Sequence, residues 1–164
     1  MPLWFFVLIQ IAILAFAFVG GVFLAFSDFI MRSLARTGGE GGIEAMQFIN
    51  REVFRWVFMA LFLGLVPVSM IIVGYTVTNS NGMAGIVMAL AGLIYLCGCF
   101  CVTLFFNVPM NEALAGMEVS DNVTKDYWTQ IYVPRWTFWN TVRTLACAVS
   151  AALLLLGLAL SANS

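Results

Sequence analysis

The sequence contains no histidine, and only 9% of its residues are charged. Without imidazole side chains, the usual ligand sets for haem, copper and non-haem iron are largely unavailable. The shortage of charge excludes a soluble domain, because 63% of the 164 residues are hydrophobic and a chain of this size cannot bury that share away from water. We therefore expect an integral membrane protein with lipid as a partner, no nucleic acid ligand, and no metal or organic cofactor.

Four apolar runs are long enough to cross a bilayer as helices, which takes about 20 residues each. They lie at residues 3–26, 56–75, 83–106 and 144–162. No Lys or Arg precedes the first run, which is also longer than the apolar part of a typical signal peptide, so we expect it to be a span. The short connections predict an all-α fold, an antiparallel four-helix transmembrane bundle that forms a single domain over residues 1–164.

No charged residue lies at the termini or in the connection at residues 76–82. All seven Lys and Arg residues, and all eight acidic residues, fall in the first and third connections or at the helix ends beside them. Because the Lys and Arg bias of short loops sets topology, the charged connections are predicted to be cytoplasmic and both termini outside. Free cysteines favour a plasma (inner) membrane that faces a reducing cytoplasm. The acids on the same side predict a structured polar cap, with a merely solvated surface as the alternative.

Residues 43–54, within the first connection, have apolar side chains at helical spacing. This segment is interpreted as an extension of the second span or as a helix lying at the membrane interface.

Polar residues gather where the spans meet the charged side. Trp136, Asn140 and Arg143 recur at helical spacing and share a face of the fourth helix. A charged residue within a span normally faces the bundle interior or a wet cavity, so we expect Arg143 to point inward toward a partner. Candidate polar partners at this depth on the other helices are Asp28, Asn50, Glu52, Asn107, Asn111 and Glu112.

Two interpretations of this constellation remain open. In the structural one, Arg143 pairs with Glu112 or Asp28, and the asparagines bond across helices to fix the register of the bundle. In the functional one, the same groups line a pocket open to the cytoplasm that binds a flat, partly polar molecule against a tryptophan. The candidate tryptophans are Trp128, Trp136 and Trp139.

Four stretches carry a resemblance to a known family: FSDFIMRSLAR, AMQFINREVF, NVPMNEAL and RWTFWNTVRTL. Together they resemble the anthrone oxygenase-like family of small four-span membrane proteins. The most specific motifs are N-x-P-x-N-x-x-L at residues 107–114 and W-x-x-W-N-x-x-R-T at residues 136–144. The resemblance implies a four-helix membrane fold and, for some relatives in polyketide pathways, oxygenation of an anthrone to an anthraquinone. It also implies site or framework roles for Asn107, Asn111, Trp136, Asn140 and Arg143.

If the protein is an oxygenase, cofactor-independent chemistry suits these residues best. A base would remove the acidic C–H of a hydrophobic aromatic substrate, and hydrogen-bond donors would stabilise the resulting oxyanion before it reacts with dioxygen. The candidate catalytic residues are Arg143 for the oxyanion and Glu112 or Asp28 as the base. The candidate substrate-binding residues are Asn50, Asn107, Asn111, Trp128, Trp136, Trp139 and Asn140.

Non-catalytic functions remain as alternatives. A stripe of small residues at Ala17, Gly21 and Ala25 could dock a partner helix, in a homo-oligomer or as an accessory subunit of a larger membrane complex, although packing within the bundle is the simpler interpretation. A lipid- or quinone-binding protein is the other alternative. A channel is not expected, because the spans contain no polar stripe that reaches the outer face. The four cysteines are interpreted as small apolar span residues rather than as metal ligands or a disulfide.

Overall fold

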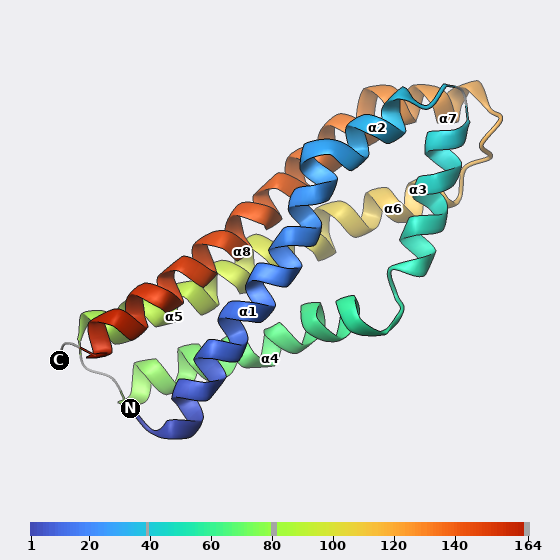
Figure 1. Cartoon of the computed structure of the whole chain (residues 1–164). Coiled ribbons are helices and arrows are strands. Elements are labelled where there is room, and N and C mark those ends of the chain that lie inside the picture. Colours follow the sequence, from blue (N-terminus) through green and yellow to red (C-terminus); the bar gives the residue numbers. More distant parts are fainter. Residues whose placement is uncertain (39, 80–81, 163–164) are drawn as a thin grey trace.

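The computed structural model describes residues 1–38, 40–79 and 82–162, and these residues form helices joined by short turns (Figure 1). Within this part of the chain, four helical segments are long and apolar enough to cross a membrane. The predictions of an all-α fold and of an integral membrane protein are confirmed.

The first of the four membrane-spanning segments contains α1 (Leu3–Ala25), the π-helical turn η1 (Phe26–Ile30) and α2 (Met31–Arg36). A separate helix, α3 (Gly41–Glu52), then leads into the second segment, α4 (Trp56–Asn79). An elbow at residues 53–55 separates α3 from α4. The segment at 43–54 is therefore not a continuous helical extension of the second span.

The third and fourth segments also combine several helices. The third contains α5 (Met83–Tyr95), η2 (Leu96–Cys101), η3 (Thr103–Asn107) and α6 (Val108–Ala115). The fourth contains α7 (Asn122–Tyr127), η4 (Trp128–Tyr132) and α8 (Val133–Ala162). The helix that contains the apolar run at residues 144–162 therefore begins earlier, at Val133, and it carries Trp136, Asn140 and Arg143 as the sequence predicted. The helix includes Asn140 and Arg143 because their polar side chains are buried inside the protein, where they need not meet lipid.

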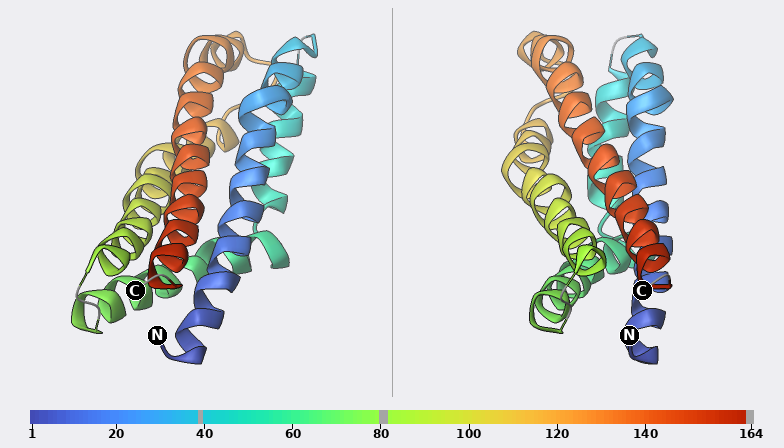
Figure 2. Two further views of the ribbon diagram at one scale, coloured as in Figure 1. Left: turned by 60° about the vertical axis from the view of Figure 1, so that its left-hand side comes forward. Right: turned by 90° about the vertical axis from the view of Figure 1, so that its left-hand side faces the viewer.

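The long helices alternate in direction. Helix α8 packs against α1 on one side and α5 on the other, and α4 packs against α5 and α1. Leu3, where α1 begins, and Ala162, where α8 ends, lie at one end of the bundle, and the charged connections lie at the opposite end (Figure 1). Figure 2 shows that α4 crosses the other long helices obliquely instead of running alongside them. Helix α3 runs back from the charged end and joins α4 at the elbow of residues 53–55 (Figure 1).

The buried hydrophobic residues form two clusters. The larger one fills the bundle toward the termini, where Phe16, Phe62 and Tyr95 meet and the Tyr95 hydroxyl donates a 2.6 Å hydrogen bond to the Phe62 carbonyl. Close helix packing there depends on glycine, since a Cβ atom on Gly92 would lie 2.8 Å from the Ser69 carbonyl oxygen. The smaller cluster closes the charged end and contains Met31, Ile43, Met46, Leu114, Trp128, Tyr132 and Trp136.

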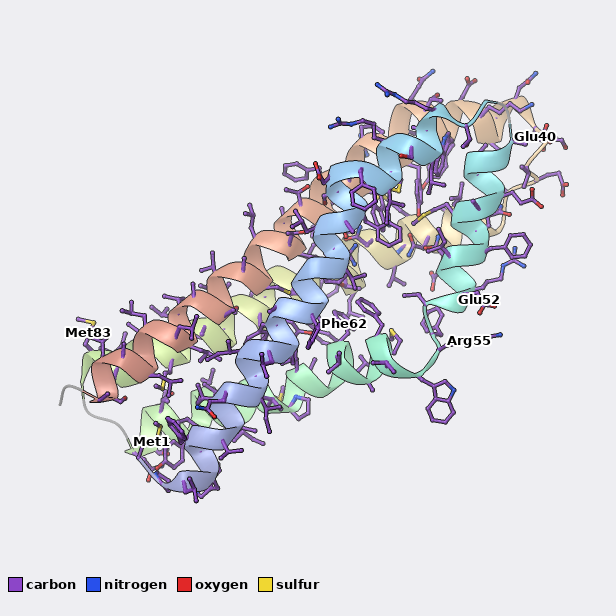
Figure 3. All side chains as sticks on the ribbon, in the orientation of Figure 1. Met1, Glu40, Glu52, Arg55, Phe62 and Met83 are labelled. Atoms are coloured by element: carbon purple, nitrogen blue, oxygen red, sulfur yellow. The ribbon has the colours of Figure 1, made fainter. Side chains whose placement is uncertain are left out.

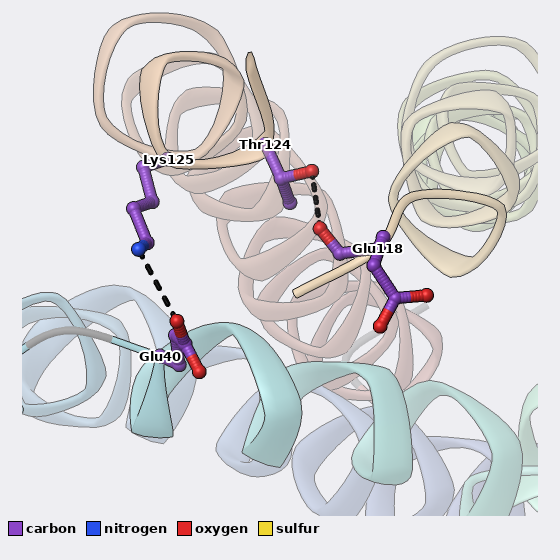
Figure 4. A network of polar contacts seen from close by, with 4 residues as sticks. All are labelled: Glu40, Glu118, Thr124 and Lys125. Atoms are coloured by element: carbon purple, nitrogen blue, oxygen red, sulfur yellow. Dashed lines mark hydrogen bonds and ion pairs between the residues drawn. The ribbon is translucent and has the colours of Figure 1, made fainter. Parts of the chain in front are cut away.

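The charged end forms a structured polar cap. Lys125 on α7 pairs with Glu40 at the start of α3 (3.2 Å), and the Thr124 hydroxyl donates to the Glu118 carbonyl (2.7 Å) (Figure 4). The buried amide of Gln47 donates to the carbonyls of Leu114 (2.8 Å) and Met117 (3.0 Å). Exposed ion pairs contribute little to stability, so these buried bonds from α3 hold the cap together more firmly than the charges do.

The small-residue stripe on α1 lies on the outside of the bundle. Ala17 and Gly21 are exposed, so the interpretation that this stripe packs the bundle internally is wrong. The adjacent Gly20 faces α8 instead, where its Cβ would lie 3.0 Å from the Cys147 Cβ. Lipid-facing and buried positions of a membrane helix are similarly apolar, and composition alone does not indicate which face is inside.

Candidate functional site

A cavity of about 680 Å³ lies at the charged half of the bundle, between α1, α3, α4, α6 and α8. The elbow between α3 and α4 forms its outer edge, where Glu52 and Arg55 project away from the bundle (Figure 3). Most of the wall is apolar, with many aromatic rings. The aromatic residues of the wall are Phe23, Phe26, Phe54, Phe58, Phe62, Phe100 and Trp136.

A few polar side chains interrupt this apolar wall. They come from four elements that meet at the same depth, which are α3, η3, α6 and α8. The polar residues of the wall are Asn50, Arg51, Thr103, Asn111, Glu112 and Arg143.

Arg143 is the most deeply placed of these groups, with only 5% of its surface exposed. Its Nη2 donates a 2.6 Å hydrogen bond to Asn140 Oδ1, and its Nη1 donates a longer one of 3.3 Å to Thr103 Oγ1. The guanidinium carbon lies 4.2 Å from the centre of the Phe23 ring and 5.3 Å from that of Trp136. Its Nε has no hydrogen-bond partner among the residues that the structure describes. Two bonds and two rings thus fix the orientation of the cation, and three of its five N–H donors, the Nε–H among them, have no partner among the described residues.

The predicted ion pair of Arg143 is not found. Among the residues that the structure describes, no carboxylate oxygen lies within ion-pairing distance of its guanidinium. Glu112 lines the cavity but is exposed on α6, and Asp28 is exposed on η1 and is not part of the wall. Both acids remain close to water because an unpaired carboxylate is costly to bury.

Asn140 stands behind Arg143 and is fully buried. Its Nδ2 donates 2.6 Å bonds to the Phe23 carbonyl and to Ser27 Oγ, while its Oδ1 accepts from Arg143. The π-helical turn that begins at Phe26 interrupts the regular α-helical bonding of the first segment here, and such turns are common at functional sites. Asn140 therefore joins α8 to α1 and positions Arg143, without lining the cavity itself.

Asn111 organises the opposite side of the site. Its Oδ1 accepts hydrogen bonds from the Tyr132 hydroxyl and from Trp136 Nε1, both of 2.8 Å. Asn50 Nδ2 in turn donates to the Tyr132 hydroxyl at 3.2 Å. This network links α3, α6, η4 and α8 and holds the Trp136 ring in place at the cavity wall.

Three other predicted residues lie outside the wall. Asn107 is buried, and its Nδ2 donates to the Trp136 carbonyl (3.3 Å). Trp128 is buried in the cap, where it stacks on Tyr132 with the ring centres 5.3 Å apart. Trp139 stacks on Phe106 at 3.7 Å. Of the predicted residues, five line the cavity: Asn50, Asn111, Glu112, Trp136 and Arg143. The others do not line it; Asn107, Asn140 and Trp128 are buried behind the wall, and Asp28 and Trp139 lie elsewhere.

Sequence reasoning missed Tyr132 and Thr103. Tyr132 could have been found, because Trp128, Tyr132, Trp136 and Asn140 are each four residues apart and share one helix face. Thr103 carried no such signal, since a threonine in a span usually bonds its own backbone, as this one also does with the Cys99 carbonyl at 2.8 Å.

The described residues contain no group of three or more His, Cys, Asp or Glu side chains placed to hold a metal ion. Cys99 and Cys147 are buried and free, and the Cys147 thiol donates to the Cys99 sulfur at 3.5 Å. The other two cysteines are also free.

Comparison with known proteins gives one assignment. No curated protein and no solved structure matches the chain. A family model described as anthrone oxygenase matches residues 51–153, which is more than half of the chain and includes the polar wall from η3, α6 and α8. This protein therefore belongs to the anthrone oxygenase family.

Proposed function

We propose that this protein is a cofactor-independent oxygenase that converts anthrone-like hydrophobic aromatics to quinones in the cavity at its charged end. The observation that carries the proposal is the buried Arg143 guanidinium at the wall of an aromatic cavity inside a membrane bundle of this family. A preorganised cation at a largely apolar cavity wall is well suited to stabilise an oxyanion.

The cavity fits a flat, apolar substrate. Its volume of about 680 Å³ lies within the range of about 300–1,000 Å³ that is usual for small-molecule sites. Aromatic rings of the wall can stack on a fused ring system, and Trp136 is held for this purpose by its bond to Asn111. A hydrophobic substrate would reach the cavity from the bilayer.

The reaction balances without a reductant. Glu112 removes a proton from the methylene carbon of the anthrone, and the charge of the resulting anion is delocalised onto the carbonyl oxygen, which Arg143 and Thr103 stabilise. The anion transfers one electron to dioxygen, and the organic radical and superoxide then form a C–O bond. The resulting peroxide takes up a proton, loses water and leaves a second carbonyl. The sum is anthrone and dioxygen giving anthraquinone and water.

The position of each residue at the cavity indicates its role in this reaction. Glu112 is exposed at the rim and can exchange protons with solvent, which a base must do after each turnover. Arg143 faces the cavity from the buried side, and Asn140 keeps its guanidinium aligned. Asn111 and Tyr132 keep the aromatic wall rigid.

The test is oxygen uptake by the purified, metal-free protein in detergent after an anaerobic mixture with anthrone is opened to oxygen. Buffer and denatured protein correct for spontaneous oxidation. We expect one quinone per oxygen consumed, a fall of about 10²–10³-fold in rate for Arg143→Ala, and a fall of about 10²-fold or more for Glu112→Gln. Glu44→Gln, which changes an exposed carboxylate of α3 away from the cavity, is the matched control and keeps full activity. A folded wild-type protein that does not exceed the spontaneous rate would refute the proposal.

A second candidate, binding of a lipid or quinone without chemistry, would use the same apolar cavity. It predicts saturable ligand binding with no oxygen uptake. For either function we propose that the charged end and its cavity face the cytoplasm, with both termini outside, because the Lys and Arg residues lie at that end.

A further inference from the structure

The positive charge of Arg143 has no counter-charge within the described part of the chain. An arginine side chain stays protonated in proteins, so the buried group is a cation. Both of its hydrogen-bond acceptors, Asn140 Oδ1 and Thr103 Oγ1, are neutral, and the two rings beside it offer only the weaker attraction of aromatic faces.

The rest of the cavity wall does not neutralise this charge. The charged residues of the wall that the structure describes are Arg51 and Arg143, which are positive, and Glu112, which is negative, so the wall carries a net charge of +1. Arg51 and Glu112 are exposed and partly screened by solvent, whereas Arg143 is only 5% exposed. Charged groups inside membrane bundles are normally paired, so an unpaired one at a cavity wall points to a partner that arrives from outside the chain.

We infer that the cavity binds hydrophobic aromatic molecules as their monoanions, with a carboxylate, phenolate or enolate oxygen against Arg143, and discriminates against neutral molecules of the same shape. Arginine has five N–H donors, and the described residues accept hydrogen bonds from only two of those of Arg143, so donors remain for an anion at the cavity wall. This inference rests on the proposed function, in that the same cavity holds the ligand, and it adds the charge state of that ligand. An anthrone would accordingly be held as its conjugate base, and the site would favour loss of the proton before oxygen reacts.

The test compares two fluorescent probes that cannot undergo the proposed oxidation. Anthracene-2-carboxylate is an anion at neutral pH, and anthracene-2-carboxamide is its neutral counterpart of nearly the same shape. Binding is titrated with the protein in nanodiscs of zwitterionic lipid, so that lipid charge does not bias the result. We expect wild-type protein to bind the carboxylate at least about tenfold more tightly than the carboxamide, because hydrogen bonds to a charged partner are the stronger kind.

Variants locate the source of this preference. Arg143→Met should lower carboxylate affinity about tenfold and leave carboxamide affinity within about threefold. Arg135→Met removes an exposed cation from the same helix outside the wall and should leave both affinities unchanged. Arg143→Lys, which keeps the charge, should keep part of the preference and guards against a fold defect in the methionine variant. Equal binding of the two probes by wild type would overturn the inference, and so would a preference that survives in Arg143→Met or that disappears only in Arg51→Met.

Two further outcomes separate this inference from others. If chloride alone displaces the carboxylate probe, the site is one for small inorganic anions and the inference is wrong. The oxygen-uptake assay is independent of the titration: anion preference without uptake refutes the proposed function and keeps the inference, and uptake without anion preference does the reverse.

Discussion

Replacing Asn140 by aspartate should place a negative charge of the protein itself next to Arg143. In our inference, a bound anionic ligand otherwise supplies that charge. The two side chains have nearly the same shape, and Asn140 Oδ1 already lies 2.6 Å from Arg143 Nη2. We therefore expect Asn140→Asp to abolish the preference for anthracene-2-carboxylate over the carboxamide while binding of the carboxamide continues.

The magnitude follows from the geometry. Two unit charges about 4 Å apart attract by about 4 kcal/mol at an effective dielectric constant of about 20. The hydrogen bonds of a charged group contribute about 1.5–3 kcal/mol, which is the range available to the ligand. The internal carboxylate therefore outweighs the attraction that Arg143 offers to a bound anion, and the affinity ratio should fall from at least about tenfold to about one.

The assay is the same nanodisc titration, with thermal melting followed by circular dichroism to verify the fold. Aspartate loses the donor that Asn140 gives to the Phe23 carbonyl, and the new ion pair offsets that loss, so we expect the bundle to remain folded. Asn122→Asp adds the same charge at an exposed position of α7 and should leave the ratio unchanged. A folded Asn140→Asp protein that still binds the carboxylate tenfold more tightly would show that Arg143 does not create the preference.

Three further predictions concern the framework and the topology. Tyr132→Phe removes the hydroxyl that bridges two asparagines and should lower the free energy of unfolding in detergent by about 1–2 kcal/mol, with the anion preference intact. Gly92→Ala should lower the free energy of unfolding by about 1–3 kcal/mol, since its Cβ would lie 2.8 Å from a backbone oxygen. Gly74→Ala, whose Cβ would meet no described atom within 4 Å, should not lower it, and equal effects of the two variants would refute this packing argument. In intact cells, a membrane-impermeant maleimide should label Thr78→Cys and not Lys125→Cys, and the opposite pattern would invert the proposed orientation.

Hydropathy was sufficient to predict the number of spans and the helical fold, but it did not predict where the helices end. The fourth apolar run begins at residue 144 because Arg143 interrupts it, while the helix extends through Arg143 back to Val133 near the charged end. Which face of α1 is buried was not predictable either, since Ala17 and Gly21 face outward and Phe16 and Gly20 face inward with similar polarity. In a membrane both faces are apolar, so the pattern that separates inside from outside in soluble helices is absent.

The candidate site was predictable only where polar residues recur at helical spacing. Trp136, Asn140 and Arg143 were placed on one inward face from their spacing alone, and the structure buries all three. The choice of Asp28 or Glu112 as an ion-pair partner was wrong, because sequence spacing within one helix does not fix distances between helices. The aromatic wall was missed for a related reason: a phenylalanine that lines a cavity has the same neighbours in sequence as one that faces lipid.

The structural and functional interpretations of the polar residues apply to different members of the set. A lock between helices accounts for the asparagines, since Asn140 joins α8 to α1 and Asn111 joins α6 to η4 and α8. It does not account for Arg143, whose shorter bond stays within α8 and whose bond across to η3 is long, at 3.3 Å. A neutral side chain could provide such links without the cost of burying a charge. The arginine therefore requires a reason beyond packing, and the cavity that it lines provides one.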